Sequence, residues 1–138
     1  MTDAELMDRA RRAAENSYSP YSKFRVGAAA MTPDGTVFTG ANIENASYPM
    51  GQCAETIAVG HAASSGERRI SVVAVACLDA TEACYPCGKC RQIMREFGVQ
   101  RVLVQDGGGD CVELGFDEIL PHSFGPETLN TPSSATDG

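Results

Sequence analysis

The chain has 138 residues, which is enough for one domain with a hydrophobic core and too few for two domains of ordinary size. Hydrophobic residues make up 43% and charged residues 21%, as in globular proteins, and no apolar run is long enough to span a membrane. The formal net charge of -7 disfavours RNA or DNA as partners, because both are polyanions, so we expect neither a nucleic acid nor a membrane partner.

The first part of the chain predicts a helix followed by a hairpin. Apolar residues at helical spacing predict a helix over residues 3–17, which Pro20 ends. Residues 24–31 and 36–42 are apolar enough to predict two strands, and residues 32–35 between them have turn chemistry. We therefore expect these strands to form an antiparallel hairpin.

The second part of the chain alternates helices and strands. Residues 53–64 are apolar around most of the helix circumference, which predicts a buried helix. Residues 70–78 form a near-continuous apolar run that predicts a strand buried on both faces. The remaining predicted elements are a helix over 87–97, strands over 99–104 and 111–114, and one helical turn over 116–120.

This order of elements predicts the α/β class. The strand–helix–strand units indicate a largely parallel sheet with helices on both faces, in a three-layer α/β/α domain. We expect a mixed sheet of five strands that begins with the antiparallel hairpin. Residues 1–127 are predicted to form a single domain, and the Thr-, Ser- and Pro-rich residues 128–138 a disordered tail.

Six cysteines occur in the chain, and their setting favours reduced thiols. The first five residues are acidic and lack the basic and apolar segments of a secretory signal, so we expect a cytoplasmic protein. In that compartment the pair Cys87 and Cys90 indicates metal binding or redox chemistry rather than a disulfide. Cys77 is expected to be an ordinary packing residue, and Cys111 either the same or partly exposed.

Three cysteines lie at the predicted starts of two helices. Cys53 begins the first of these helices, and Cys87 and Cys90 lie in the first turn of the second, just after Pro86. In open α/β sheets, ligands bind beyond the strand ends where helices begin, so both helix starts are expected to face one site. Helix dipoles favour thiolates there, and a catalytic zinc takes three protein ligands. The sequence therefore predicts one Zn²⁺ per chain.

Glu55 follows the first of these cysteines by two residues, which suits a proton shuttle beside the metal. Zinc lets water ionise near neutral pH, and one carboxylate can take a proton from water and later give it up. An alternative is a closed four-cysteine structural zinc, or an iron–sulfur cluster, completed by Cys84. Against this alternative, Cys84 precedes the helix start, and Glu55 would have no purpose in a closed site.

The runs Cys53-Ala54-Glu55 and Pro86-Cys87-Gly88-Lys89-Cys90 match a zinc deaminase signature. At these residues, and over most of residues 18–127, the chain resembles the cytidine deaminase family, specifically its small three-cysteine form. The resemblance implies zinc-dependent hydrolysis of cytidine and deoxycytidine to uridine and deoxyuridine plus ammonia, in pyrimidine salvage. Glu55 would pass a proton from the attacking water to N3 of cytosine and later protonate the departing amine.

The resemblance also implies substrate contacts. Phe24 matches a residue that lines the pocket, Asn42 and Glu44 match residues that hold sugar hydroxyls, and Ala54 belongs to the motif at the substrate. Without the resemblance, Asn42 and Glu44 would more simply close a turn after their strand.

The segment 120–126 matches the family's tail. There, Phe124 would cover the base in the site of a neighbouring subunit, because members of the small form are usually homotetramers. A structural role of Phe124 on its own subunit remains an alternative.

Other functions share some of these features. Deamination of a cytosine-containing antibiotic nucleoside uses the same zinc motifs, but the tail over 123–126 favours the salvage enzyme. Editing of cytosine in RNA or DNA is disfavoured by the acidic charge. A structural zinc module that binds a partner protein would have no use for Glu55.

One position departs from the family pattern. Many three-cysteine members have an arginine directly after the catalytic glutamate, where it donates to ligand thiolates, whereas this chain has Thr56. The Thr56 hydroxyl can donate one bond but carries no charge, and zinc with three thiolates has one net negative charge. Arg91 is a candidate for offsetting that charge, and zinc is still expected to bind.

Overall fold

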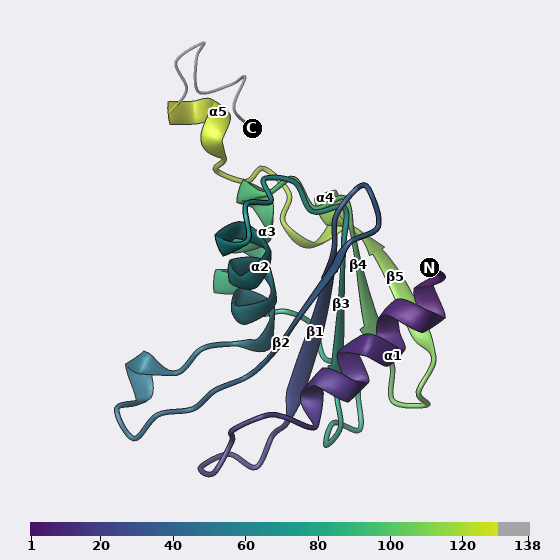
Figure 1. The fold of residues 1–138 in the computed structure, drawn as a ribbon, viewed down its shortest axis with the longest axis vertical. Coiled ribbons are helices and arrows are strands. Elements are labelled where there is room, and N and C mark those ends of the chain that lie inside the picture. Colours follow the sequence, from purple (N-terminus) through teal and green to yellow (C-terminus); the bar gives the residue numbers. More distant parts are fainter. Residues whose placement is uncertain (130–138) are drawn as a thin grey trace.

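Five strands form one mixed sheet in the computed structural model, which describes residues 1–129 (Figure 1). Across the sheet, β1 is antiparallel to β2 and β3, β3 is parallel to β4, and β4 is antiparallel to β5. The expected five-stranded mixed sheet and its N-terminal hairpin are therefore confirmed. The strands are β1 (Val26–Met31), β2 (Val37–Ala41), β3 (Val72–Cys77), β4 (Arg101–Gln105) and β5 (Cys111–Gly115).

The expectation of a largely parallel sheet is wrong, because in the described part of the chain only β3 and β4 pair in parallel. Helix α2 (Ala54–Ser64) connects β2 to β3, and these two strands run in the same direction, as a strand–helix–strand unit requires. However, β1 lies between them and is antiparallel to both. The alternation of predicted strands and helices predicts that β2 and β3 run in the same direction. It does not predict which strand lies between them, because that depends on contacts between distant segments.

Helices cover both faces of the sheet, which confirms the three-layer architecture (Figure 1). Helix α1 (Asp3–Ala14) packs Leu6, Met7 and Ala10 onto one face. Helices α2 and α3 (Gly88–Glu96) lie on the other face, where their apolar side chains join the larger hydrophobic core. Both faces of β3 are buried, as its sequence predicts. Within residues 1–129, no helix has both the length and the apolar character needed to cross a membrane.

Several element ends differ from those predicted. Helix α1 begins with a capping box between Thr2 and Glu5 and ends at Ala14, because the chain then turns so that the Tyr18 N–H donates to Asn42 O. Three short helices complete the fold, of which only α4 was expected: η1 (Tyr48–Met50), α4 (Phe116–Ile119) and α5 (Pro126–Leu129). Of the predicted disordered tail, residues 128 and 129 belong to α5, and 130–138 lie outside the described residues.

A glycine in β2 allows α2 to pack directly on the sheet. A Cβ placed on Gly40 would lie 2.5 Å from Ala58 N and 2.7 Å from Ala54 O, both in the backbone of α2. Because these atoms belong to a helix, they cannot yield as the end of a flexible side chain would. Gly40 therefore sets the position of the helix start that carries Cys53 and Glu55.

Replacing Gly40 by alanine is expected to lower the free energy of unfolding by about 2–3 kcal/mol, because the new methyl group must push α2 away from β2. The matched control is Gly60→Ala in the exposed face of α2, where an added Cβ meets nothing within 4 Å. There the same change should raise stability by about 0.5–1 kcal/mol, because alanine is the better helix former. Urea unfolding of the parent and of both variants measures these changes in the free energy of unfolding. A Gly40→Ala protein as stable as the Gly60→Ala protein would contradict the prediction.

Candidate metal centre and active site

Two helix starts bring three thiols together. Cys53 is the N-cap residue of α2 and Cys87 the N-cap residue of α3, each with the extended backbone that this position requires. Cys90 lies in the first turn of α3 and is fully buried. Because α2 and α3 pack on the same face of the sheet, their N-termini converge at one place.

The spacing of the three sulfur atoms fits a tetrahedral zinc site. The Cys53 and Cys87 sulfurs are 3.8 Å apart, those of Cys87 and Cys90 are 3.6 Å apart, and all three lie within 4.8 Å of one another. Zinc–sulfur bonds of about 2.3 Å at tetrahedral angles place sulfur atoms about 3.8 Å apart. The residues present can therefore hold Zn²⁺ and leave its fourth position free.

Electrostatics at the helix starts favour the thiolate form of Cys53. Its pKa is lowered to about 6, because the thiols of Cys90 and Cys87 donate hydrogen bonds to the sulfur and the charge of Lys89 adds to their effect, while burial acts in the opposite direction. A thiol that loses its proton near neutral pH is ready to bind a metal ion, since the thiolate is the ligand.

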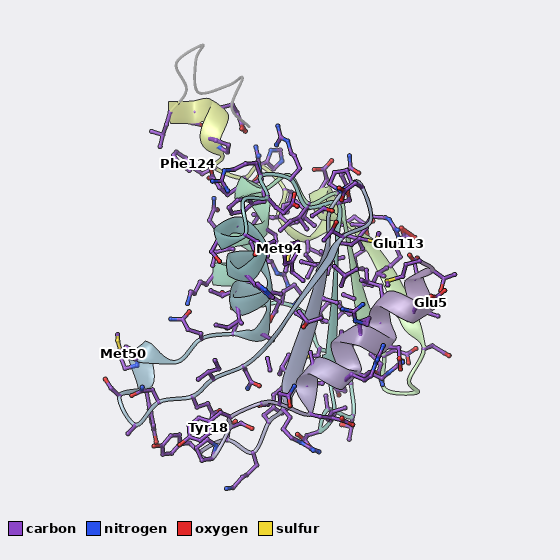
Figure 2. All side chains as sticks on the ribbon, in the orientation of Figure 1. Glu5, Tyr18, Met50, Met94, Glu113 and Phe124 are labelled. Carbon is purple, nitrogen blue, oxygen red and sulfur yellow. The ribbon has the colours of Figure 1, made fainter. Side chains whose placement is uncertain are left out.

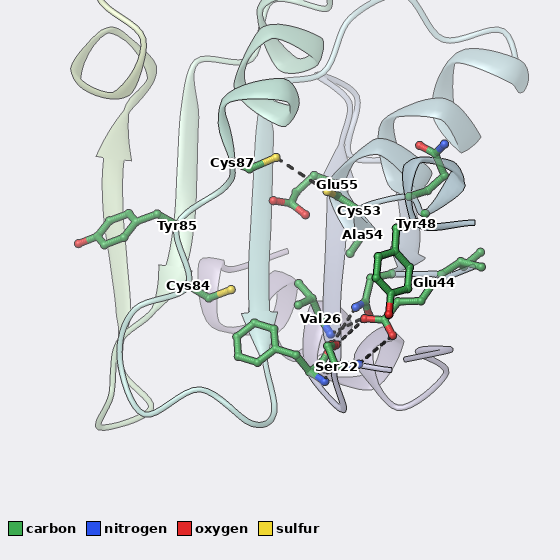
Figure 3. Close-up of a pocket in the computed structure, with 15 residues that line it drawn as sticks. Ser22, Val26, Glu44, Tyr48, Cys53, Ala54, Glu55, Cys84, Tyr85 and Cys87 are labelled. Carbon is green, nitrogen blue, oxygen red and sulfur yellow. Dashed lines mark hydrogen bonds between the residues drawn. The ribbon is translucent and has the colours of Figure 1, made fainter. Parts of the chain in front are cut away.

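Glu55 lies beside these sulfurs, in the second residue of α2 (Figure 3). Its side chain is buried with 5% of its surface exposed, and this burial raises its pKa to about 7; the nearby Cys53 acts in the same direction. A carboxyl group that titrates near neutral pH can both accept and donate a proton under working conditions. The geometry therefore suits Glu55 to the proton transfers expected from the sequence.

Cys84 stands apart from the three-thiol cluster. Among residues 1–129, the group of side chains close enough to share a metal ion contains Cys53, Cys87 and Cys90 and does not include Cys84. The Cys84 thiol is half-buried, and its pKa is raised to about 12 by burial, with Cys77 and Glu55 nearby. This arrangement favours the open three-cysteine site over the closed four-cysteine alternative.

Replacing Cys84 by alanine is therefore expected to leave one zinc per chain, because the sulfur removed is not in the cluster. Zinc content is measured by atomic absorption on protein prepared without added chelator. A drop to well below one zinc per chain in a folded Cys84→Ala protein would support the four-cysteine site instead.

A cleft of about 630 Å³ opens in front of the sulfurs, within the usual size range of small-molecule sites. Four of the five substrate residues expected from the sequence line it, together with Glu55: Phe24, Asn42, Glu44 and Ala54. Figure 3 shows Glu44, Ala54 and Glu55 in this wall. Phe124 does not line it; it is exposed and lies at the far end of the molecule from Tyr18 (Figure 2).

Sequence reasoning missed several residues of the cleft. Ser22 and Val26 also line the cleft, on either side of Phe24, but Lys23 has a positive φ of 62° and Ser22 lies in a turn, so no strand-like alternation marks them in the sequence. Cys84 and Tyr85 enter the cleft from the loop before α3, and no local pattern indicates this. The Tyr85 ring points away from Glu55 (Figure 3).

Asn42 and Glu44 brace the wall of the cleft. The Glu44 carboxylate accepts from the backbone N–H groups of Tyr21 and Ser22 at 3.0 and 3.1 Å, and from the Ser22 hydroxyl, and these bonds lower the Glu44 pKa. Asn42 Oδ1 accepts from Val26 N at 3.0 Å, and Asn42 Nδ2 donates to Phe24 O at 2.8 Å. Both side chains thus order residues 21–26, ahead of β1, rather than a turn after β2, and both line the cleft.

Of the two residues expected to offset the charge of three thiolates, Thr56 contacts a sulfur, whereas Arg91 makes its hydrogen bonds elsewhere. The Thr56 hydroxyl lies 3.6 Å from Cys90 Sγ, as expected for a donor without charge. The candidate Arg91 is used differently: its Nε donates to Pro86 O at 2.8 Å and its Nη1 to Ile119 O at 2.7 Å. Arg91 therefore holds the loop before α3 against the chain near α4.

Comparisons with known proteins give one consistent result. The family model for the cytidine and deoxycytidylate deaminase zinc-binding region matches residues 1–106. The chain is 43% identical over 127 residues to a cytidine deaminase of Halalkalibacterium halodurans, covering 91% of this chain and 96% of that protein. It is 42% identical over 125 residues to one of Mycobacterium tuberculosis, covering 90% of each.

Solved structures agree with these sequence matches. A crystal structure of cytidine deaminase from Burkholderia pseudomallei superposes with a TM-score of 0.84 at 40% identity, covering 90% of this chain and 100% of that one. Cytidine deaminase from Bacillus anthracis, at 17% identity and a TM-score of 0.72, shares the fold. The likeness thus extends well beyond the metal-binding motifs.

Proposed function

The chain belongs to the cytidine and deoxycytidylate deaminase family, and from this premise we propose that it hydrolyses cytidine and deoxycytidine to uridine and deoxyuridine plus ammonia, in pyrimidine salvage. The observation that carries the proposal is that one cleft of the size of a small-molecule site brings together three thiols, at a spacing that fits zinc, and the buried carboxyl group of Glu55. The experiment that tests the proposal follows the conversion of cytidine by the loss of its ultraviolet absorbance. The zinc content of the same sample is measured alongside.

Cys53, Cys87 and Cys90 would hold one Zn²⁺ per chain, and their sulfur spacing supports this assignment. When bound, zinc would lower the pKa of a water molecule at its open position. The helix starts that carry these ligands point their partial positive charges toward the thiolates, which makes three negative groups tolerable in a small volume.

Glu55 moves the protons of the reaction. It takes one proton from the attacking water and delivers it to N3 of cytosine, while the water oxygen bonds to C4. It then takes the second proton of that oxygen and gives it to the amino group, so that ammonia leaves and the C4 carbonyl forms. Each transfer leaves the carboxyl group in the state that the next one needs, and its pKa of about 7 supports both directions.

The cleft wall positions the nucleoside. Phe24 offers an aromatic surface to the base, and Ala54 at the first position of α2 keeps the space beside Glu55 small. Glu44 retains acceptor capacity for sugar hydroxyls, and Asn42 retains one amide hydrogen, beyond their bonds to the protein. Glu55 lies at the buried side of the cleft, where little of its side chain is open to bulk solvent.

We further propose a homotetramer in which Phe124 covers the base in a neighbouring subunit's site. Phe124 is 55% exposed and lies outside the cleft of its own chain, which supports a role elsewhere. Large side chains are also exposed nearby, as is typical of surfaces that pair with another copy: Ile43 and Tyr48 line the cleft, and Tyr18 and Met50 lie at the end of the molecule opposite Phe124 (Figure 2). We also propose a single domain over residues 1–127 and a cytoplasmic location, where free cysteines such as these six stay reduced.

Mixing two variants with different defects tests the shared site. Phe124→Ala is expected to raise KM for cytidine, whereas Glu55→Gln should abolish turnover; in mixed tetramers, some sites receive Glu55 from one chain and Phe124 from the other. After dissociation and reassembly, cytidine turnover at low substrate should exceed the sum of the two separate proteins. No gain over that sum, in assemblies shown to be mixed by mass spectrometry, would place Phe124 on its own subunit.

A further inference from the structure

A lysine joins the two segments that carry the cysteines. Lys89 lies in the first turn of α3, between Cys87 and Cys90, and its ammonium Nζ donates to Gln52 Oε1 at 3.1 Å. Gln52 directly precedes Cys53, the N-cap residue of α2. The bond thus reaches from one ligand-carrying segment to the other and brings a positive charge with it.

The site has a charge that needs such a partner. Zinc with three thiolates carries one net negative charge, and the carboxyl group of Glu55 lies beside it. Groups that donate to thiolates or place positive charge near them tune the metal and its ligands. Thr56 contacts Cys90 without carrying a charge, and the hydrogen bonds of the Arg91 guanidinium go to two backbone carbonyls rather than to a sulfur.

We propose that Lys89, docked on Gln52, is a positioning residue that offsets the negative charge of the three-thiolate site and holds its two ligand segments together. This role rests on the proposed zinc site. The Lys89 side chain is exposed, so its effect is screened by dissolved ions and is larger at low salt than at high salt. A purely structural contact would not show that dependence.

The test measures zinc affinity by competition with a chromophoric chelator, at low and at high sodium chloride. Lys89→Met, which keeps most of the side-chain length, is expected to weaken zinc binding about tenfold at low salt and clearly less at high salt. Lys89→Arg keeps the charge and should stay within about threefold of the parent at both salt concentrations. The control is Arg12→Met, which changes net charge equally on the exposed face of α1.

Two results overturn the proposal. In the first, Lys89→Met binds zinc as tightly as Arg12→Met does. In the second, Lys89→Arg loses as much zinc affinity as Lys89→Met does. Far-ultraviolet circular dichroism of the metal-free variants verifies that each is folded. If the parent chain bound no zinc, the proposed zinc site would fail and this role with it. If the parent binds zinc and the Lys89 variants do not differ from the control, only the role of Lys89 fails.

Discussion

Replacing Glu55 by glutamine is expected to lower cytidine turnover by about 1,000-fold or more, because one side chain supplies every proton transfer of the reaction. Zinc should remain at one per chain, since the three sulfurs are untouched. Glutamine has nearly the shape of a protonated glutamate, and burial already favours the uncharged form of Glu55. The unfolding temperature is therefore expected to be equal to or higher than that of the parent.

The control for this change is Glu15→Gln, which removes the same charge from an exposed position after α1 and should leave turnover unchanged. Turnover, zinc content and thermal unfolding are measured on the same preparations. A Glu55→Gln protein that keeps one zinc and also keeps activity within tenfold of the parent would remove Glu55 from the mechanism.

The three-thiol cluster and the neighbouring Glu55 were predictable because their signal is local. A cysteine at a helix start, a glutamate two residues later and a second helix start with Pro86, Cys87 and Cys90 are each visible within a few residues. Local chemistry then fixes their geometry, since N-cap positions hold Cys53 and Cys87 in extended backbone at the mouth of each helix. The strand β3 was equally predictable, because six consecutive buried positions require a continuous apolar run.

The remainder depended on contacts between distant segments. The sequence does not encode locally that β1 enters between β2 and β3, so the sheet was expected to be more parallel than it is. The hydrogen bond from Lys89 to Gln52 spans two segments far apart in the chain, and it became visible only with both helices in place. The short helix η1 escaped prediction because three residues cannot show a helical period, although Pro49 in its first turn favours a helix start.

Replacing Cys90 by alanine is expected to remove zinc and, with it, activity. Mutating a residue that only hydrogen-bonds to a metal ligand weakens metal binding by up to about 100-fold. Loss of a direct ligand should therefore weaken zinc binding by more than this. The matched control is Cys77→Ala, because Cys77 is also a buried free cysteine, in β3, but is outside the three-thiol cluster. Cys77→Ala should keep one zinc per chain at a small cost in stability from lost packing.

Thermal unfolding with and without a chelator separates loss of metal from loss of fold. A ligand that binds only the folded state at about 1,000 times its Kd stabilises that state by about 4 kcal/mol, which corresponds to an unfolding temperature higher by about 15 °C for a domain of this size. Chelation should therefore lower the unfolding temperature of the parent and of Cys77→Ala, and leave that of Cys90→Ala unchanged. If chelation destabilised all three proteins equally, Cys90 would not be a ligand. If chelation affected none of them, the stability of the fold would be independent of the metal. The zinc content of Cys90→Ala and Cys77→Ala would then decide which of the two cysteines binds zinc.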